Sequence, residues 1–381
     1  MPDVPTVTAP GAVGTPVRID LDPPAVAMVW LGADRPHEVV AVPRVALAPG
    51  EALVAIELAT ICGSDVHTTA GRRRAPVPLV LGHEYVGRIV ATGGDVRAID
   101  GSLLFHGDRV VWSIMAGCGT CDRCRRGIPQ KCRALVKYGH ERLEPRWELT
   151  GGFASHVHLR RGTAMLRVSE SVPAEVLAPA SCGTATAWAA VERADDTTDI
   201  DDAVVLVLGA GLIGLTAAAI AADRGARVIV ADPDARRRDL ALRFGAAAAV
   251  DPLDPSAREA ALADLGRAEI DVVIEASGSA AAVASAIDAV GVGGIVVLVG
   301  SVFPGGSLTV DPERLVRNLV TISGVHNYTP HDLHAAVRFL HARHTRYPFD
   351  ELVGARMPLA DVDAALELAR SGDSVRVGLV P

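Results

Sequence analysis

Aromatic residues are scarce in this chain of 381 residues, at 4% of the sequence. Ala, Val and Gly therefore carry much of the apolar fraction, which is 49%, against 22% for charged residues. That balance is typical of a globular enzyme and excludes a disordered or fibrous protein. The length exceeds the usual range for one hydrophobic core, so we expect two or three domains.

A continuous basic tract is also missing. The formal net charge is −8, and the cationic residues stand in short separate groups, so a nucleic-acid surface is not expected. The densest groups are Arg72–Arg74 and Arg236–Arg238. The first triplet has two interpretations, a solvated loop or a site that binds an anionic group such as a phosphonate through guanidinium hydrogen bonds.

No export signal stands at the start, because residues 1–20 lack a basic stretch followed by an apolar one. We therefore expect a cytoplasmic protein with a flexible extension over residues 1–24. One window, Ala203–Ala222, is twenty residues without a charge, which is long enough for a membrane span. Glycines at dinucleotide-binding spacing inside it favour instead a buried strand running into a buried helix, and no membrane is expected.

The chain divides into two regions that differ in their pattern of apolar residues. Residues 25–165 hold short Val-, Ile- and Leu-rich runs between Pro and Gly turns, which indicates β-strands. From about Pro173, strands alternate with Ala-rich helices, which predicts a parallel, doubly wound sheet and an α/β fold. The expected division is a mostly-β catalytic domain at 25–180 with a metal lobe at 117–133, a Rossmann cofactor domain at 181–326, and a return to the catalytic domain at 327–381.

A glycine-rich loop follows the strand-like run VVLVLG and opens an Ala-rich helix. Gly209 permits a tight turn, Gly211 lets backbone approach a pyrophosphate, and Gly214 lets the helix pack on the strand. Leu212 and Ile213 lie between them, where the helix N-terminus offers N–H groups to phosphate. The alternative is a glycine turn with a purely structural role.

Asp232 ends the next strand-like run, RVIVAD, twenty-one residues after Gly211. An acid at that place can bind the adenosine ribose hydroxyls and repels a 2′-phosphate, which favours NAD. The nearby Arg236–Arg238 leave NADP open.

Four cysteines lie within one short stretch, GCGTCDRCRRGIPQKC. Four thiolates on one loop can close a tetrahedral zinc site with bonds of about 2.3 Å and no open position, so we expect a structural zinc. An iron–sulfur cluster is the main alternative, and disulfides are a weaker one. The predicted ligands are Cys118, Cys121, Cys124 and Cys132.

The remaining cysteines, Cys62 and Cys182, form a second set with His83. Two thiolates and an imidazole leave the fourth position of a zinc ion open for water or an alcohol, which is what catalysis requires. Asp65 is placed to accept the second ring N–H of His83 and so to fix its tautomer. Each of these residues alone would be read as packing, and their combination beside a dinucleotide fold favours a second, catalytic zinc.

At this point the chain resembles the zinc-containing medium-chain alcohol dehydrogenases over roughly residues 25–381. The resemblance implies a GroES-like catalytic domain, two zinc ions per chain and NAD. It implies Cys62, His83 and Cys182 as catalytic ligands and Glu84 as a neighbour that can swing onto zinc. It also implies a proton relay from the alcohol through Ser64 and the cofactor ribose to His67, and Arg376 near the cofactor pyrophosphate.

Within that family, WSIMAGCGTC, GIPQKC and KYGHE are most similar to alcohol dehydrogenases associated with phosphonate catabolism, and more loosely to cyclitol dehydrogenases of natural-product pathways. Sorbitol-type polyol dehydrogenases fit less well, because they usually carry Glu where this chain has Cys182.

The leading hypothesis is a zinc-dependent enzyme that oxidises a small primary or secondary alcohol with NAD. Alternatives are a cyclitol or polyol dehydrogenase, a hydroxyalkyl-phosphonate dehydrogenase and, in a different class, a non-catalytic NAD-binding zinc protein. We expect a homodimer or homotetramer, with Gly306–Val310 as a strand-like candidate interface at the edge of a sheet.

Overall fold

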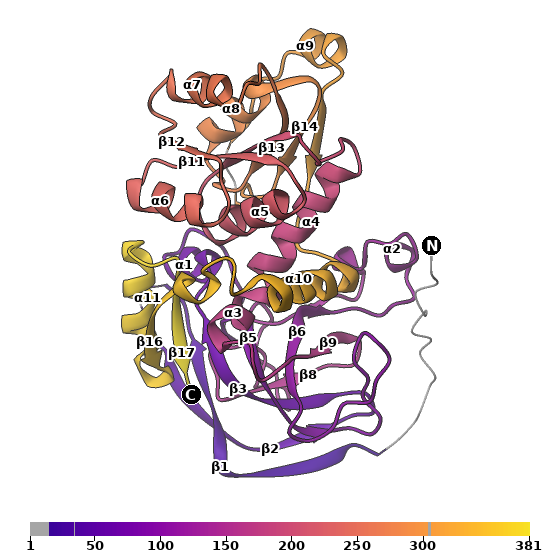
Figure 1. The fold of residues 1–381 in the computed structure, drawn as a ribbon. Coiled ribbons are helices and arrows are strands. Elements are labelled where there is room, and N and C mark those ends of the chain that lie inside the picture. The colour runs from indigo at the N-terminus through magenta and orange to yellow at the C-terminus, as the bar shows by residue number, and fades with distance from the viewer. Residues whose placement is uncertain (1–14, 34, 304–305) are drawn as a thin grey trace. The chain divides into compact units, whose positions relative to one another are not determined.

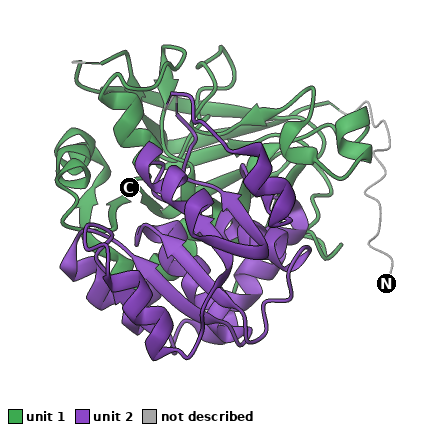
Figure 2. Cartoon of the chain, turned by 90° about the horizontal axis from the view of Figure 1, so that it is seen from above, with its two compact units in different colours: residues 1–182, 350–381 green, residues 183–349 purple. Residues whose placement is uncertain are grey.

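The computed structural model describes residues 15–33, 35–303 and 306–381. The chain forms two compact units, one of Met1–Cys182 with Asp350–Pro381 and one of Gly183–Phe349 (Figure 2). The first fourteen residues of the expected extension lie outside the described part.

For residues 17–24 the expectation of a flexible extension is wrong, because these residues form part of a strand. Residues 17–24 belong to β1 (Val17–Trp30), which pairs antiparallel with β2 (Glu38–Leu47), as Figure 1 shows. Ile19 and Leu21 alternate with exposed residues and pack against the core of unit 1, which explains why this stretch is ordered as a strand.

The expected return to the catalytic domain at residue 327 is also wrong, because unit 2 continues to Phe349. Helix α10 (Pro330–Arg343) packs against α4 (Gly183–Asp195), where the Trp188 and Phe339 rings lie 6.1 Å apart. Phe339 and Phe349 then join Phe244 and Tyr347 in an aromatic cluster of unit 2. These contacts hold residues 327–349 on the Rossmann side.

Unit 1 contains two sheets. One has the order β2-β1-β4 and the other the order β16-β17-β3-β5-β6-β7, with β8 on β3 and β9 on β6. The remaining strands are β3 (Ala52–Thr60), β4 (Leu79–Val80), β5 (Glu84–Thr92), β6 (Arg109–Ala116), β7 (Val136–Lys137), β8 (His156–Leu159), β9 (Thr163–Arg167), β16 (Val353–Pro358) and β17 (Arg376–Val380).

Short helices join these strands: α1 (Gly63–Thr69), α2 (Asp122–Arg125), η1 (Pro129–Lys131), α3 (Ala174–Leu177), η2 (Ala178–Ser181), η4 (Leu359–Asp361) and α11 (Val362–Ser371), with η3 (Phe349–Leu352) at the change of unit. Tyr85 and Trp112 stack at 4.0 Å in the core between the strands.

Unit 2 confirms the predicted parallel, doubly wound sheet. Its strand order is β12-β11-β10-β13-β14-β15, and every described pair is parallel. The strands are β10 (Val204–Leu208), β11 (Arg227–Ala231), β12 (Ala248–Val250), β13 (Ile270–Glu275), β14 (Val290–Leu298) and β15 (Thr321–Gly324). The other helices are α5 (Leu212–Asp223), α6 (Ala235–Arg243), α7 (Ala257–Asp264), α8 (Ala280–Ala289) and α9 (Pro312–Arg317).

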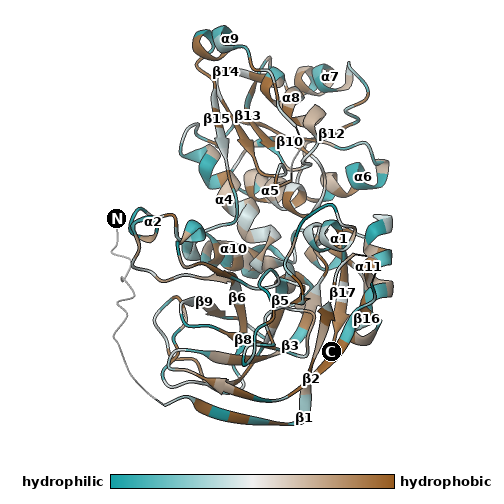
Figure 3. Ribbon diagram, turned by 180° about the vertical axis from the view of Figure 1, so that it is seen from behind, coloured by the Kyte–Doolittle hydropathy of each residue, from teal (hydrophilic) through white to brown (hydrophobic). Residues whose placement is uncertain are grey.

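The uncharged window Ala203–Ala222 is β10 followed by α5, and both are buried almost throughout. Figure 3 colours β10 and β13 brown, whereas α6 is largely teal. Among the described residues, no helix has the length and apolarity to cross a membrane. Gly306–Val310 is not a strand, so β15 forms the edge of the sheet there.

Candidate catalytic and metal sites

Cys62 stands at the N-terminus of α1, directly after β3. The Cys62 N–H donates to Asp65 Oδ2 at 3.0 Å, and the Asp65 N–H donates to the Cys62 carbonyl oxygen at 3.0 Å. This reciprocal cap satisfies two N–H groups at the helix start and fixes the backbone that carries the thiol. Asp65 is fully buried, so its carboxylate is a rigid part of the site.

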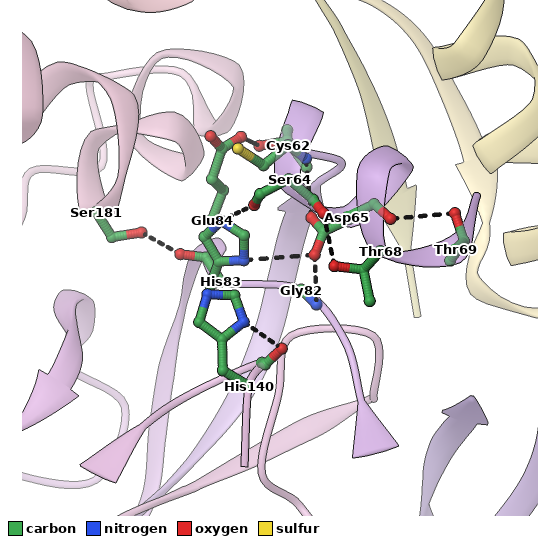
Figure 4. A network of polar contacts seen from close by, with 12 residues as sticks. Cys62, Ser64, Asp65, Thr68, Thr69, Gly82, His83, Glu84, His140 and Ser181 are labelled. Atoms are coloured by element: carbon green, nitrogen blue, oxygen red, sulfur yellow. Dashed lines mark hydrogen bonds and ion pairs between the residues drawn. The ribbon is translucent and has the colours of Figure 1, made fainter. Parts of the chain in front are cut away.

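His83 is presented by a tight turn between β4 and β5. Gly82 has a φ of +87°, and a Cβ at that position would lie 2.4 Å from the Phe153 ring, so only glycine fits. Nε2 of His83 lies 3.2 Å from Ser64 Oγ, and Nδ1 lies 3.4 Å from Asp65 Oδ1 (Figure 4). The Nδ1 contact is long for a hydrogen bond, but Asp65 occupies the position that the sequence predicts.

Cys182 completes the set after η2. The preceding residue, Ser181, donates its hydroxyl to the His83 carbonyl oxygen at 3.1 Å, which ties the two segments together. The sulfurs of Cys62 and Cys182 and a ring nitrogen of His83 all lie within 4.8 Å of one another. Among the described residues, no fourth His, Cys, Asp or Glu joins this group.

The three side chains of the group set one another's ionisation, and binding of a metal ion would have to displace the protons of His83 and Cys182. A hydrogen bond from Cys182 holds the pKa of the Cys62 thiol well below its usual value, against the effect of burial, and the Arg376 charge adds to it. The same hydrogen bond and burial raise the pKa of Cys182. Burial lowers the pKa of His83, but Asp65 and Cys62 raise it to about 10. Two half-buried sulfurs and a buried imidazole form the kind of donor set that can hold a catalytic zinc.

Glu84 follows His83 at the start of β5 and is fully buried. Its carboxylate accepts the Thr60 hydroxyl at 2.7 Å and two hydrogen bonds from Arg376 at 2.7 and 2.9 Å. Burial raises the pKa of Glu84 to about 7, against the lowering effect of Arg376. Arg376 Nη2 also lies 3.8 Å from Cys62 Sγ. The structure thus brings Arg376 to Glu84, and its expected contact with a cofactor pyrophosphate stays a prediction.

Ser64 and His67 lie three residues apart on α1 and so share one face of the helix. Both are half-buried. Burial, and then the charge of Arg72, lower the pKa of His67, although Cys62 opposes them. The lowered pKa favours the neutral imidazole, which is the form that can accept a proton.

The four-cysteine lobe brings its sulfurs together through α2 and η1. The Sγ–Sγ distances are 3.5 Å for Cys121–Cys124, 3.9 Å for Cys121–Cys132 and 3.4 Å for Cys132–Cys118. A tetrahedral zinc with bonds of about 2.3 Å requires about 3.8 Å between sulfurs. Backbone N–H groups of Cys118 and Ala134 point at Cys132 Sγ, at 3.3 and 3.4 Å, as suits a thiolate. The lobe fits a closed metal site.

The glycine loop of unit 2 has the expected geometry. Gly209 has a φ of +98°, and Gly211 caps α5. A Cβ on Gly214 would lie 1.8 Å from the Gly209 carbonyl oxygen, so the helix start and the strand end are in direct contact. Leu212 is buried and Ile213 half-buried in the first turn of α5.

Asp232 at the end of β11 is buried, and both of its oxygens accept backbone N–H groups, from Ala210 at 2.7 Å and from Asp234 at 2.9 Å. Each of the three neighbouring arginines donates a hydrogen bond to a nearby acceptor. Arg236 binds Asp234, Arg237 donates to the Ala210 carbonyl oxygen, and Arg238 donates to the Asp232 carbonyl oxygen.

Two residues that contact the cluster or its neighbour Glu84 were not singled out by any pattern in the sequence. Thr60 holds Glu84, and the His140 ring lies 4.9 Å from the His83 ring, centroid to centroid. Burial and the charges of His83, Lys137 and Arg73 hold the pKa of His140 well below its usual value. The motif KYGHE contains both Lys137 and His140, but nothing in its spacing predicts that it meets His83.

Comparisons with known proteins agree with this geometry. Residues 48–169 match the alcohol dehydrogenase GroES-like domain, and residues 213–342 match the zinc-binding dehydrogenases. The chain belongs to the zinc-binding alcohol dehydrogenase family. It is an oxidoreductase with a GroES-like domain and a Rossmann domain, as predicted, and the non-catalytic alternative is set aside.

Individual relatives differ in their substrates. The chain is 31% identical to a 5-exo-hydroxycamphor dehydrogenase of Pseudomonas putida, over 86% of this chain and 91% of that protein. It is 33% identical to an L-threonine 3-dehydrogenase of Deinococcus deserti, over 73% and 77%.

Solved structures extend the likeness to nearly the whole chain. An alcohol dehydrogenase of Thermotoga maritima matches with a TM-score of 0.86 and 30% identity, over 94% of this chain and 99% of that one. A zinc-binding dehydrogenase of Sinorhizobium meliloti bound to NADP matches with a TM-score of 0.79 and 25% identity, over 94% and 99%. None of these four proteins is named as a dehydrogenase of phosphonate catabolism or of cyclitols.

Proposed function

We propose that the chain oxidises a small primary or secondary alcohol to the aldehyde or ketone and transfers the hydride to NAD. The alcohol carbon gives up its hydride to the oxidised cofactor, and the hydroxyl gives up its proton. The products are the carbonyl compound, NADH and that proton. The observation that carries the proposal is the convergence of Cys62, His83 and Cys182 beside the hydroxyl of Ser64.

Zinc bound by Cys62, His83 and Cys182 would act as a Lewis acid that lowers the pKa of a substrate alcohol. Asp65 would hold the His83 ring by facing its Nδ1, which leaves Nε2 for the metal. The second metal would be held by the four cysteines of the lobe and would stabilise that loop alone.

Ser64 and His67 would move the alcohol proton. The Ser64 hydroxyl lies at the cluster, and His67 is one helical turn further on the same face of α1. The lowered pKa of His67 supports a role as proton acceptor near neutral pH.

The glycine loop and Asp232 support NAD as the acceptor. The free N–H groups at the start of α5 suit a pyrophosphate, and the Asp232 carboxylate would repel a 2′-phosphate. The arginines of α6 are engaged with Asp234 and with backbone carbonyl groups, which weakens the case for NADP.

The deciding experiment measures metal content per chain by mass spectrometry together with NAD reduction. The substrate panel contains simple alcohols, polyols, a cyclitol and hydroxyalkyl phosphonates. We expect two zinc ions and turnover of at least one substrate, with H83A losing turnover while keeping the lobe zinc. Two zinc ions without turnover across the panel would overturn the proposed reaction, and iron in place of zinc would overturn both metal assignments.

A further inference from the structure

Glu275 is a fully buried acid at the end of β13, at the carboxyl edge of the parallel sheet of unit 2. It pairs in register with Leu208, the last residue of β10, and the two strands lie side by side in Figure 3. Strands β10 to β12 extend from this pair in one direction and β13 to β15 in the other, so the strand order reverses there. A ligand of such a sheet binds in the crevice outside the carboxyl ends at that point. Glu275 therefore ends one of the two strands that border the expected cofactor crevice.

The side chain of Glu275 holds the turn that follows its own strand. Its Oε1 accepts three hydrogen bonds, from the Ser277 N–H at 2.8 Å, the Ser277 hydroxyl at 2.6 Å and the Gly278 N–H at 2.8 Å. Ser277 Oγ in turn accepts the N–H of Ser279, which caps α8, at 3.1 Å. One buried oxygen thus fixes the backbone between the end of β13 and the start of α8.

This turn lies directly against the glycine loop. A Cβ on Gly209 would lie 3.0 Å from Ser277 Cβ and 3.1 Å from the Ser277 backbone nitrogen, so the first glycine of the loop and Ser277 are in contact. On the other side of the turn, a Cβ on Gly278 would lie 2.6 Å from the carbonyl oxygen of Gly300, just beyond β14. The position of Ser277 therefore limits where Gly209 can lie.

The second carboxyl oxygen of Glu275 shows that stability alone does not account for this acid. Oε2 is buried and has no hydrogen-bond partner among the described residues. A buried polar atom without a partner costs free energy, and an apolar side chain of similar size would fill the place without that cost. The favourable contribution of Glu275 therefore lies in the contacts of Oε1, which act on the turn beside the glycine loop.

We propose that Glu275 is a positioning residue for the cofactor, which holds Ser277 against Gly209 and so keeps the glycine loop in the shape that binds NAD. The inference rests on the proposed function, because NAD is the proposed cofactor. Glu275 is itself fully buried, so it acts through the turn and does not touch the cofactor. Its loss should weaken NAD binding and leave the zinc content unchanged, because the predicted zinc ligands belong to unit 1.

The test measures NAD binding by calorimetry of the zinc-loaded protein without an alcohol. E275L keeps the volume but removes the acceptor of all three donors, so it should raise the dissociation constant for NAD about 10- to 100-fold. E275Q keeps a neutral oxygen acceptor and should lie between the wild type and E275L, at about three- to tenfold. In turnover, E275L should raise KM for NAD by a similar factor and change kcat by less than about threefold.

Asp271 offers a matched control at the opposite end of the same two strands. Its Oδ2 accepts the N–H of Val204, the first residue of β10, at 2.8 Å, so this carboxyl group also ties β13 to β10. D271L should lower the free energy of unfolding in urea but leave the dissociation constant for NAD within about twofold, because the crevice lies at the carboxyl ends. If E275L were destabilised like D271L and bound NAD like the wild type, the inference would be overturned, because Glu275 would then only stabilise the sheet.

Binding without an alcohol also separates this inference from the proposed reaction. If the wild type binds NAD, E275L binds it weakly and no alcohol is turned over, the reaction fails and the role of Glu275 stands. If alcohols are turned over and E275L binds NAD like the wild type, the reaction stands and the inference fails. Should E275L not fold, E275Q decides alone, and a dissociation constant within about twofold of the wild type then overturns the inference.

Discussion

Arg376 donates two hydrogen bonds to Glu84, at 2.7 and 2.9 Å, and both side chains are buried. The pair joins β17, near the end of the chain, to the residue beside His83. We expect R376L to lower the free energy of unfolding by about 3–5 kcal/mol, because it leaves the buried Glu84 carboxylate without its cation. Urea unfolding of the zinc-loaded protein measures this.

The exposed pair Arg370–Glu367 offers a matched control at 2.6 Å. R370L should change the free energy of unfolding by less than about 1 kcal/mol, because water already screens that pair. If both variants lost the same small amount, the buried pair would not be a structural link of unit 1.

Replacing one cysteine of the four-cysteine lobe should release the metal of the lobe and leave the other metal bound. C132S should reduce zinc from two ions per chain to one and lower the thermal midpoint, because Cys132 is the buried member of its set. Turnover at 25 °C should persist, since Cys62, His83 and Cys182 belong to a separate group. Mass spectrometry of C132S and C62S gives the count for each, and loss of both ions from C132S would contradict independent sites.

Local spacing explains what the sequence predicted well. The glycine loop and the four-cysteine lobe each lie within one short stretch, so turn geometry and bond lengths constrain them directly. Cys62, His83 and Cys182 could be singled out because cysteine is rare in this chain and metal chemistry requires such a set, and the structure brings them together. The approach of Asp65 to His83 could be expected because Asp65 lies three residues from Cys62 on one helix.

Long-range contacts explain what the sequence missed. The partners Arg376 and Glu84 are 292 residues apart, and no periodicity relates them. The boundary at Phe349 depends on an aromatic cluster assembled from Phe244 and the segment after α10. His140 belongs to a motif that marked a subgroup, but only the long-range approach of Gly139 to Gly82 brings its ring beside that of His83.

Two glycines of the cofactor loop should respond differently to alanine. G214A should lower stability by about 1–3 kcal/mol, because its Cβ would lie 1.8 Å from the Gly209 carbonyl oxygen. G211A meets nothing within 4 Å and should unfold like the wild type, yet raise KM for NAD by blocking the approach of pyrophosphate. Urea unfolding and NAD kinetics of both variants test the pair. Wild-type KM in G211A would remove Gly211 from the cofactor site.

Asp232 should set the choice of cofactor. D232A removes the carboxylate that would repel a 2′-phosphate, so the ratio of kcat/KM for NAD to that for NADP should fall by at least about tenfold. D254N, at an exposed turn outside the loop, should leave the ratio unchanged. An unaltered ratio in D232A would mean that Asp232 acts only through its hydrogen bonds to Ala210 and Asp234.

Glu51 should make unit 1 sensitive to acid. Burial raises the pKa of this carboxyl, but a 2.8 Å hydrogen bond to His158, the Ala48 N–H and Arg160 outweigh it and hold the pKa below its usual value of 4.5. Because the folded pKa is the lower one, the ionised carboxyl stabilises the fold above pH 4.5, and this stabilisation disappears as the pH falls through the folded value.

The variant E51Q should therefore be less stable than the wild type at pH 7, by about 1–3 kcal/mol, and the difference should shrink as the pH falls below 4.5. Urea unfolding of both proteins at several pH values between about 3.5 and 7 measures the gap directly, and zinc loss in acid affects both alike. E367Q, at an exposed position, should show no such convergence. A gap between E51Q and the wild type that stays constant or widens in acid would mean that the Glu51–His158 contact stabilises the fold without depending on the carboxylate charge.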